Sequence, residues 1–181
     1  MGSHINRSSP PPARSVMDSL RRLVHGLRVF DREAERAAGL SGAQLFVLSR
    51  LAAGGAASIN ELATRTFTHQ SSVSVVARKL VERGLAARAP SNGDGRRVEL
   101  AISTAGRRVL ASAPAAAQER LIAAVHRLPP AERDKLAALL EHLVAAAGLG
   151  RSRPRLFFEE AAKVKKQNKE SNHHARTKKA Q

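Results

Sequence analysis

Apolar positions in residues 16–38 recur at the spacing of one face of a helix. The stripe is formed by Val16, Leu20, Leu23, Val24, Leu27 and Ala34, and it is widened by Val29 and Phe30. A helix with so broad an apolar arc often contacts a second chain. The residues before it, 1–15, contain the run SSPPP, which disfavours packing and helix formation, and we expect them to be disordered.

Two more helix starts follow, and a capping box marks each. Ser41 and Gln44 form an S-x-x-Q pattern, and Ser58 and Glu61 form an S-x-x-E pattern. In such a box the serine oxygen and the side chain three residues later satisfy free amides of the first helical turn. The sequence therefore predicts one helix that ends near Gly54 and a short helix after it.

The next predicted helix, at about residues 69–83, has an apolar side and a polar side. Its expected buried stripe is formed by Val73, Val76, Ala77 and Leu80. The opposite side and its flanks carry Gln70, Ser71, Ser72, Ser74, Val75, Arg78 and Lys79. Gly84 is the expected C-terminal stop.

A short basic hairpin is predicted next. Residues 85–89 favour a strand, 91–95 have turn chemistry, and 98–102 alternate as in a return strand. Arg96 and Arg97 lie at its tip. Two short helices followed by an arginine-tipped hairpin are how a protein presents a helix to the major groove of DNA and a wing to the adjacent minor groove.

Two further helices are predicted towards the C-terminus. Thr104 is the expected cap of the first, which extends through Val125 and is kinked or interrupted at Pro114. Pro129 and Pro130 begin the last helix. Its apolar stripe is formed by Leu136, Leu139, Leu140, Leu143 and Val144.

This interpretation gives one domain, residues 16–148. Its DNA-binding core spans about residues 41–106, and the flanking helices span about 16–38 and 104–147. Residues 149–181 are rich in lysine and arginine and form a basic C-terminal tail.

Charge then narrows the class of partner. Lysine and arginine outnumber aspartate and glutamate by 31 to 15, which gives a net charge of +16 and points to nucleic acid or an anionic membrane.

The chain has no apolar run long enough to span a membrane and no apolar signal-peptide core, so we expect a cytoplasmic protein. The absence of cysteine excludes disulfides and thiolate metal sites. With no catalytic constellation or metal-ligand spacing, we expect neither an enzyme nor a cofactor.

Four stretches carry a family resemblance. They are LSGAQLFVLSRL at 40–51, ELATRT at 61–66, SSVSVVARKLVERGL at 71–85 and DGRRVELAISTAG at 94–106. Together they resemble the MarR family of bacterial winged-helix transcription regulators, over most of the chain between Leu20 and Leu143. The last stretch is the most specific, since it is similar to the family's wing.

The resemblance implies a mainly helical fold: a winged helix-turn-helix with a small β-hairpin wing, flanked by N- and C-terminal dimerisation helices. It implies a homodimer in which each subunit offers one recognition helix and one wing to double-stranded DNA. In many members a small aromatic or anionic compound binds between the dimerisation and DNA-binding parts and releases the DNA. Other members sense oxidants through cysteine, which this chain lacks.

The predicted DNA contacts lie on the helix at 69–83 and on the hairpin. On the helix they are Gln70, Ser71, Ser72, Ser74, Val75, Arg78 and Lys79, and on the hairpin they are Arg88, Asp94, Arg96 and Arg97. Arg96 is the foremost candidate, because a guanidinium at a wing tip can enter an A·T-rich minor groove. The family pattern implies that Asp94 holds Arg96 by a salt bridge, and an Asx turn at Asp94 is the alternative. For the other residues the alternatives are phosphate contact or simple solvation.

The sequence also suggests residues for a ligand site. His25 and Arg28 lie on the first helix, and Phe46 and Arg50 lie on the next, where the ligand cleft of such a fold would begin. A histidine and an arginine beside an apolar cleft could hold a carboxylate or a phenolate. The alternative, which we favour for these residues, is an interface or surface role.

Together these features predict a dimeric, sequence-specific DNA-binding regulator. We expect a repressor of a pseudo-palindromic operator with half-sites about 10 bp apart. The alternative is a non-specific architectural DNA-binding protein, which the charge of +16 would also suit.

Overall fold

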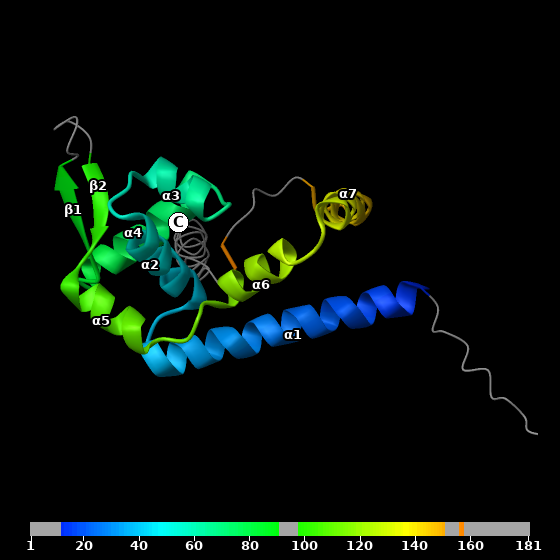
Figure 1. Ribbon diagram of the computed structural model, residues 1–181, viewed down its shortest axis with the longest axis horizontal. Coiled ribbons are helices and arrows are strands. Elements are labelled where there is room, and N and C mark those ends of the chain that lie inside the picture. The colour runs from blue at the N-terminus through cyan, green and yellow to red at the C-terminus, as the bar shows by residue number, and fades with distance from the viewer. Residues whose placement is uncertain (1–11, 91–97, 151–155, 158–181) are drawn as a thin grey trace, which may run out of the picture.

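The computed structural model describes residues 12–90, 98–150 and 156–157, which form seven helices and one antiparallel β-hairpin (Figure 1). The elements are α1 (Pro12–Ala38), α2 (Gly42–Gly54), α3 (Ile59–Arg65), α4 (Gln70–Glu82), β1 (Ala86–Pro90), β2 (Val98–Ile102), α5 (Thr104–Ser112), α6 (Ala117–His126) and α7 (Pro130–Ala146). The predicted fold class, a mainly helical winged helix with a small hairpin, is confirmed.

Helix α1 begins at Pro12, within the segment that we expected to be disordered. The expectation was wrong for residues 12–15, because proline is well suited to the first turn of a helix, where its missing N–H has no partner to lose. At the other end Gly39 adopts a positive φ of 62° and ends the helix, as predicted.

Both predicted capping boxes are present. The Ser41 hydroxyl accepts a hydrogen bond from the Gln44 amide at 3.3 Å, and the Gln44 side chain accepts one from the Ser41 amide at 3.2 Å. Ser58 and Glu61 make the same pair of bonds, at 3.3 and 2.7 Å. These reciprocal bonds fix where α2 and α3 start.

The core lies between α2, α3, α4 and the hairpin, which form a compact lobe at one end of α1 (Figure 1). Its largest fully buried side chains include Phe46, Leu48, Leu62 and Leu80. Leu100 of β2 joins this core and pairs with Ala57 through two backbone hydrogen bonds of 2.8 and 2.9 Å. The hairpin is thereby tied to the chain before α3.

Pro114 lies in the break between α5 and α6, so the predicted interruption is confirmed. The cap of α5 is Ser103 and not Thr104: the Ser103 backbone is extended, and its hydroxyl accepts a hydrogen bond from the Gly106 amide at 3.0 Å. Thr104 is already the first helical residue.

Two helices leave wide apolar surfaces uncovered within the subunit. No residue of α7 is buried, and this helix stands apart from the lobe (Figure 1). Its exposed apolar side chains are Leu136, Leu139, Leu140, Leu143 and Val144, and those of α1 are Val16, Met17, Leu23, Val24 and Val29. None of the described helices is both long enough and apolar enough to cross a membrane.

The chain returns to the lobe after α7. Leu156 is only 3% exposed and belongs to the core, although the predicted domain boundary at 148 placed it in the tail. Neither Leu156 nor Phe157 is helical.

Candidate nucleic-acid interface

Helix α4 has one buried face and one free face. Val73, Val76, Ala77 and Leu80 are buried, which confirms the predicted stripe. Of the side chains predicted to contact DNA, Gln70, Ser71, Ser74 and Arg78 are exposed, and Val75 and Lys79 are partly buried. The helix therefore presents a polar and cationic surface to solvent.

Ser72 does not belong to that surface. It is 4% exposed, so the prediction that it contacts DNA disagrees with the structure. The reason lies in helical spacing: Ser72 precedes Val76 by one turn and Leu80 by two, and all three share the inward face. The small side chain of Ser72 fits where α4 packs closely against the rest of the lobe.

Two arginines from different elements face one cavity beside α4. Arg78 comes from α4, Arg88 comes from β1, and Ser74 lies with them. The cavity measures about 220 Å³, and its apolar wall consists of Ile59, Ala77, Val98 and Leu100. Within the described residues neither guanidinium has a carboxylate partner, since all three ion pairs lie elsewhere. Two such guanidiniums suit an anionic oxygen ligand such as a phosphate.

The tip of the hairpin, with Asp94, Arg96 and Arg97, lies outside the described residues. The strands that lead to it are described, and their register pairs Pro90 with Val98 and Arg88 with Leu100. The roles of the three tip residues stay predictions.

The four predicted ligand residues do not line a common cleft. His25 and Arg28 are exposed on α1, and neither lines any of the cavities described here. Phe46 is fully buried in the core, and the Arg50 guanidinium lies 5.2 Å from its ring centre. Arg50 also forms an ion pair with Glu119 of α6. Phe46 and Arg50 thus join α2 to its neighbours, and within the described residues the four side chains do not share one of these cavities.

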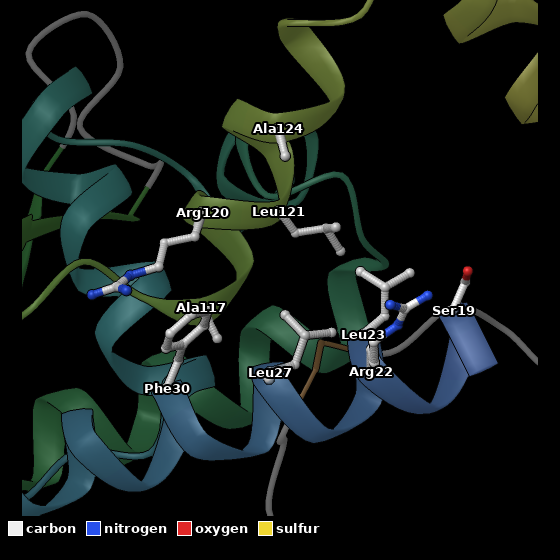
Figure 2. Close-up of a pocket in the computed structure, with 10 residues that line it drawn as sticks. Ser19, Arg22, Leu23, Leu27, Phe30, Ala117, Arg120, Leu121 and Ala124 are labelled. Carbon is white, nitrogen blue, oxygen red and sulfur yellow. The ribbon is translucent and has the colours of Figure 1, made fainter.

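A larger cavity, of about 460 Å³, lies between α1 and α6. Figure 2 shows Leu23 and Leu27 of α1 directed towards Leu121 of α6, with Arg120 over the ring of Phe30 at 4.2 Å. Sequence analysis missed this cavity because its two walls are far apart in the chain.

A second apolar cavity, of about 310 Å³, lies between α6 and the turn before α4. Its walls are Phe67, Gln118, Leu121, Ile122, Val125, His126 and Phe157. Gln118 donates a hydrogen bond from Nε2 to the Thr66 carbonyl at 3.4 Å, while its buried Oε1 has no partner among the described residues. Phe67 holds a positive φ of 52°, a conformation that bulky residues rarely adopt. No group of three or more metal-ligating side chains occurs in the described part of the chain.

Comparison with known proteins identifies the fold. Residues 38–97 match the sequence model of the MarR family. Among curated proteins, none matches this sequence. A MepR-like protein crystallised with pseudoligands is 23% identical, with a TM-score of 0.52 over 75% of this chain and 96% of that chain. BpsR of Bordetella bronchiseptica, whose DNA binding is regulated by 6-hydroxynicotinic acid, is 25% identical, with a TM-score of 0.51 over 78% and 97%.

The family match begins at the last residue of α1 and includes α2, α3, α4 and β1, the elements that build the lobe and its polar helix face. The similarity of fold extends over about three quarters of the chain. Residues 38–97 of this protein thus resemble the MarR family in sequence, and its winged-helix fold is similar to that of BpsR.

Proposed function

We propose that this protein is a dimeric, sequence-specific DNA-binding repressor that reads a pseudo-palindromic operator with α4 and the hairpin. The observation that carries the proposal is the convergence of Arg78 and Arg88 beside the exposed face of α4. In this arrangement α4 enters the major groove, and Arg88 contacts a phosphate at its edge. The net charge of +16 favours the encounter with DNA.

The test uses a duplex that the wild-type protein itself selects from random DNA, compared with a scrambled duplex at one fixed salt concentration. A specific regulator should prefer the selected duplex by roughly a thousandfold or more. A ratio near one would instead favour the architectural alternative.

Single variants then separate base contact from phosphate contact. Arg78→Ala should weaken binding to the selected duplex by about 1–3 kcal/mol and reduce the preference for it over the scrambled duplex. Arg88→Ala should weaken binding to both duplexes by the same factor. Arg36→Ala is the matched control, because it removes one exposed cation from α1. If Arg78→Ala behaves like this control, α4 does not read the bases.

The dimer is proposed from the uncovered apolar faces of α1 and α7. Exposed apolar side chains on these two helices are unfavourable in water, and a second copy of the chain would cover them. Two recognition helices related by a twofold axis would then meet two half-sites.

For release from DNA we propose the cavity between Phe67 and α6 as the effector site. Its walls are mostly apolar, and Gln118 Oε1, which has no partner among the described residues, would accept a hydrogen bond from an aromatic hydroxyl or ring N–H. Phe67 precedes α4 by only three residues, so a ligand against its ring would act on the recognition helix. Hydroxylated aromatic compounds should release the selected duplex from the wild type and fail to release it from Gln118→Leu.

A further inference from the structure

The side chain of Arg83 joins the end of α4 to the junction between α1 and α2. Its Nη1 donates a hydrogen bond to the Gly39 carbonyl at 2.8 Å and another to the Gln44 Oε1 at 3.3 Å. Its own backbone N–H bonds to the Lys79 and Val81 carbonyls and caps α4. One residue therefore connects the end of the recognition helix to the end of α1.

The junction that Arg83 contacts is itself held in place. The Gly39 amide bonds to the Glu35 carbonyl at 2.8 Å, and Gly39 adopts a positive φ, so its carbonyl has a defined direction. Gln44 is buried and occupied by the capping box with Ser41. Asp31 of α1 also accepts a hydrogen bond from the Gly42 amide at the start of α2. A guanidinium that binds these groups is attached to a rigid support.

An arginine suits this position. Nη1 of the planar guanidinium bonds two acceptors at once, and the charge lies at the carbonyl end of α1, where the helix dipole favours a cation. A lysine also carries several donors on one nitrogen, but its shorter, flexible side chain lacks the planar group that directs Nη1 towards both acceptors.

We infer that Arg83 is a positioning residue that fixes α4 relative to α1 and thereby sets the half-site spacing that the dimer accepts. The inference rests on the proposed function, in which α1 pairs the two subunits. In a twofold dimer, a small rotation of the lobe about the end of α1 changes the distance between the two recognition helices. Loss of the Arg83 contacts should therefore alter spacing preference more than it alters the reading of one half-site.

The experiment compares wild type, Arg83→Met, Arg83→Lys and the control Arg36→Met. The probes are the duplex that the wild type selects from random DNA, the same duplex with one base pair inserted or deleted between its half-sites, and a duplex with one half-site. For Arg83→Met, the preference for the native spacing should fall roughly three- to tenfold, with nearly unchanged affinity for the single half-site. The spacing preference of Arg83→Lys should lie between that of Arg83→Met and that of the wild type, and the spacing preference of Arg36→Met should equal that of the wild type.

Thermal unfolding of each variant separates positioning from stability. If Arg83→Met keeps the wild-type spacing profile, or loses affinity equally on every duplex in step with its melting temperature, Arg83 is a stabilising cap only. If the wild type binds scrambled and selected DNA alike, the proposed function fails as well. The two outcomes can be distinguished, because failure of the Arg83 inference is seen only in the variants, whereas failure of the proposed function is seen in the wild-type protein.

Discussion

The guanidinium of Arg50 on α2 forms an ion pair with the carboxylate of Glu119 on α6. The same carboxylate accepts a hydrogen bond from the Ser49 hydroxyl at 2.6 Å and one from the Ala116 amide at 3.3 Å. Glu119 thus caps the start of α6 and also attaches this helix to α2 in the lobe. The Arg50 and Glu119 side chains are 31% and 22% exposed, so the pair is shielded from water over most of its surface.

Removal of one partner should be costlier than removal of both. Glu119→Ala leaves the Arg50 charge partly buried without a counter-ion, and we expect the free energy of unfolding to fall by about 2 kcal/mol. Arg50→Met combined with Glu119→Ala should cost less than the sum of the two single changes, because no charge is then left unpaired. Urea unfolding of the four proteins measures this coupling, and additive losses would show that the pair contributes nothing.

Gly106 permits the closest approach of α5 to the hairpin. A β-carbon at this position would lie 2.2 Å from the Leu85 carbonyl oxygen and 2.9 Å from Ile102 Cγ1. The same carbonyl accepts a hydrogen bond from the Ser103 amide at 3.0 Å, so a methyl group would also break that bond. Gly106→Ala should therefore lower the free energy of unfolding by about 3 kcal/mol. The control is Gly26→Ala, where a β-carbon meets no atom of the subunit within 4 Å.

Leu156 should contribute to stability like any other core leucine. Leu156→Ala is expected to lower the free energy of unfolding by about 2–4 kcal/mol, since its side chain is almost fully buried. Leu149→Ala, at a side chain that is 62% exposed, serves as the control and should cost little. Equal, small effects in thermal unfolding would mean that the segment after α7 does not complete the core.

Asp31 should make stability depend on pH. Burial raises the pKa of its carboxyl above the ordinary value, the hydrogen bond from the Gly42 amide lowers it in part, and the charge of Glu35 raises it. The folded state then holds the proton more tightly than the unfolded state does. The stabilising contribution is therefore complete below the ordinary pKa and is lost as the pH rises through the raised pKa.

Asp31→Asn keeps an oxygen acceptor for Gly42 and removes the charge. We compare the free energy of unfolding of the variant with that of the wild type at each pH. The difference should favour the variant more at about pH 7 than at about pH 4. Urea unfolding at both pH values measures the difference, and the opposite trend would mean that the hydrogen bond outweighs burial. Glu33→Gln, at an exposed position of α1, is the control.

The apolar stripe of α7 should hold the subunits together. Leu139→Gln combined with Leu143→Gln places two polar groups on this stripe in each subunit, and the dissociation constant of the dimer should rise at least about a hundredfold. Sedimentation at micromolar concentration measures it. Val98→Gln removes an equally exposed apolar side chain from the hairpin and should leave the assembly unchanged.

Local signals predicted most of the helix and strand boundaries. Ser41 with Gln44, and Ser58 with Glu61, specify helix starts through contacts between neighbours in the chain, and Pro114 interrupts a helix wherever it stands. Helical spacing was also sufficient to place Ser72 on the buried face of α4, since it lies one turn before Val76. Ser72 was nevertheless predicted to contact DNA because serine is polar, and the helical spacing was given too little weight.

Long-range contacts account for what sequence analysis missed. Nothing near Arg50 in the chain indicates Glu119 as its partner, and the ring of Phe46 turns inward because the whole core closes around it. The cavity walled by Phe67 and Phe157 joins three distant segments. A pair of apolar residues such as Leu156 and Phe157 has too little periodicity to distinguish a core contact from a tail.

The place of Leu156 in the core also bears on how the protein is synthesised. The ribosome adds the segments of the lobe before α5, α6 and α7, and it adds Leu156 only after α7. Until then the newly made lobe has an unfilled apolar position, which is the kind of surface that draws a nascent chain towards chaperones or incorrect contacts. The core of the lobe can therefore be completed only after the ribosome has added Leu156, which follows every described helix and strand.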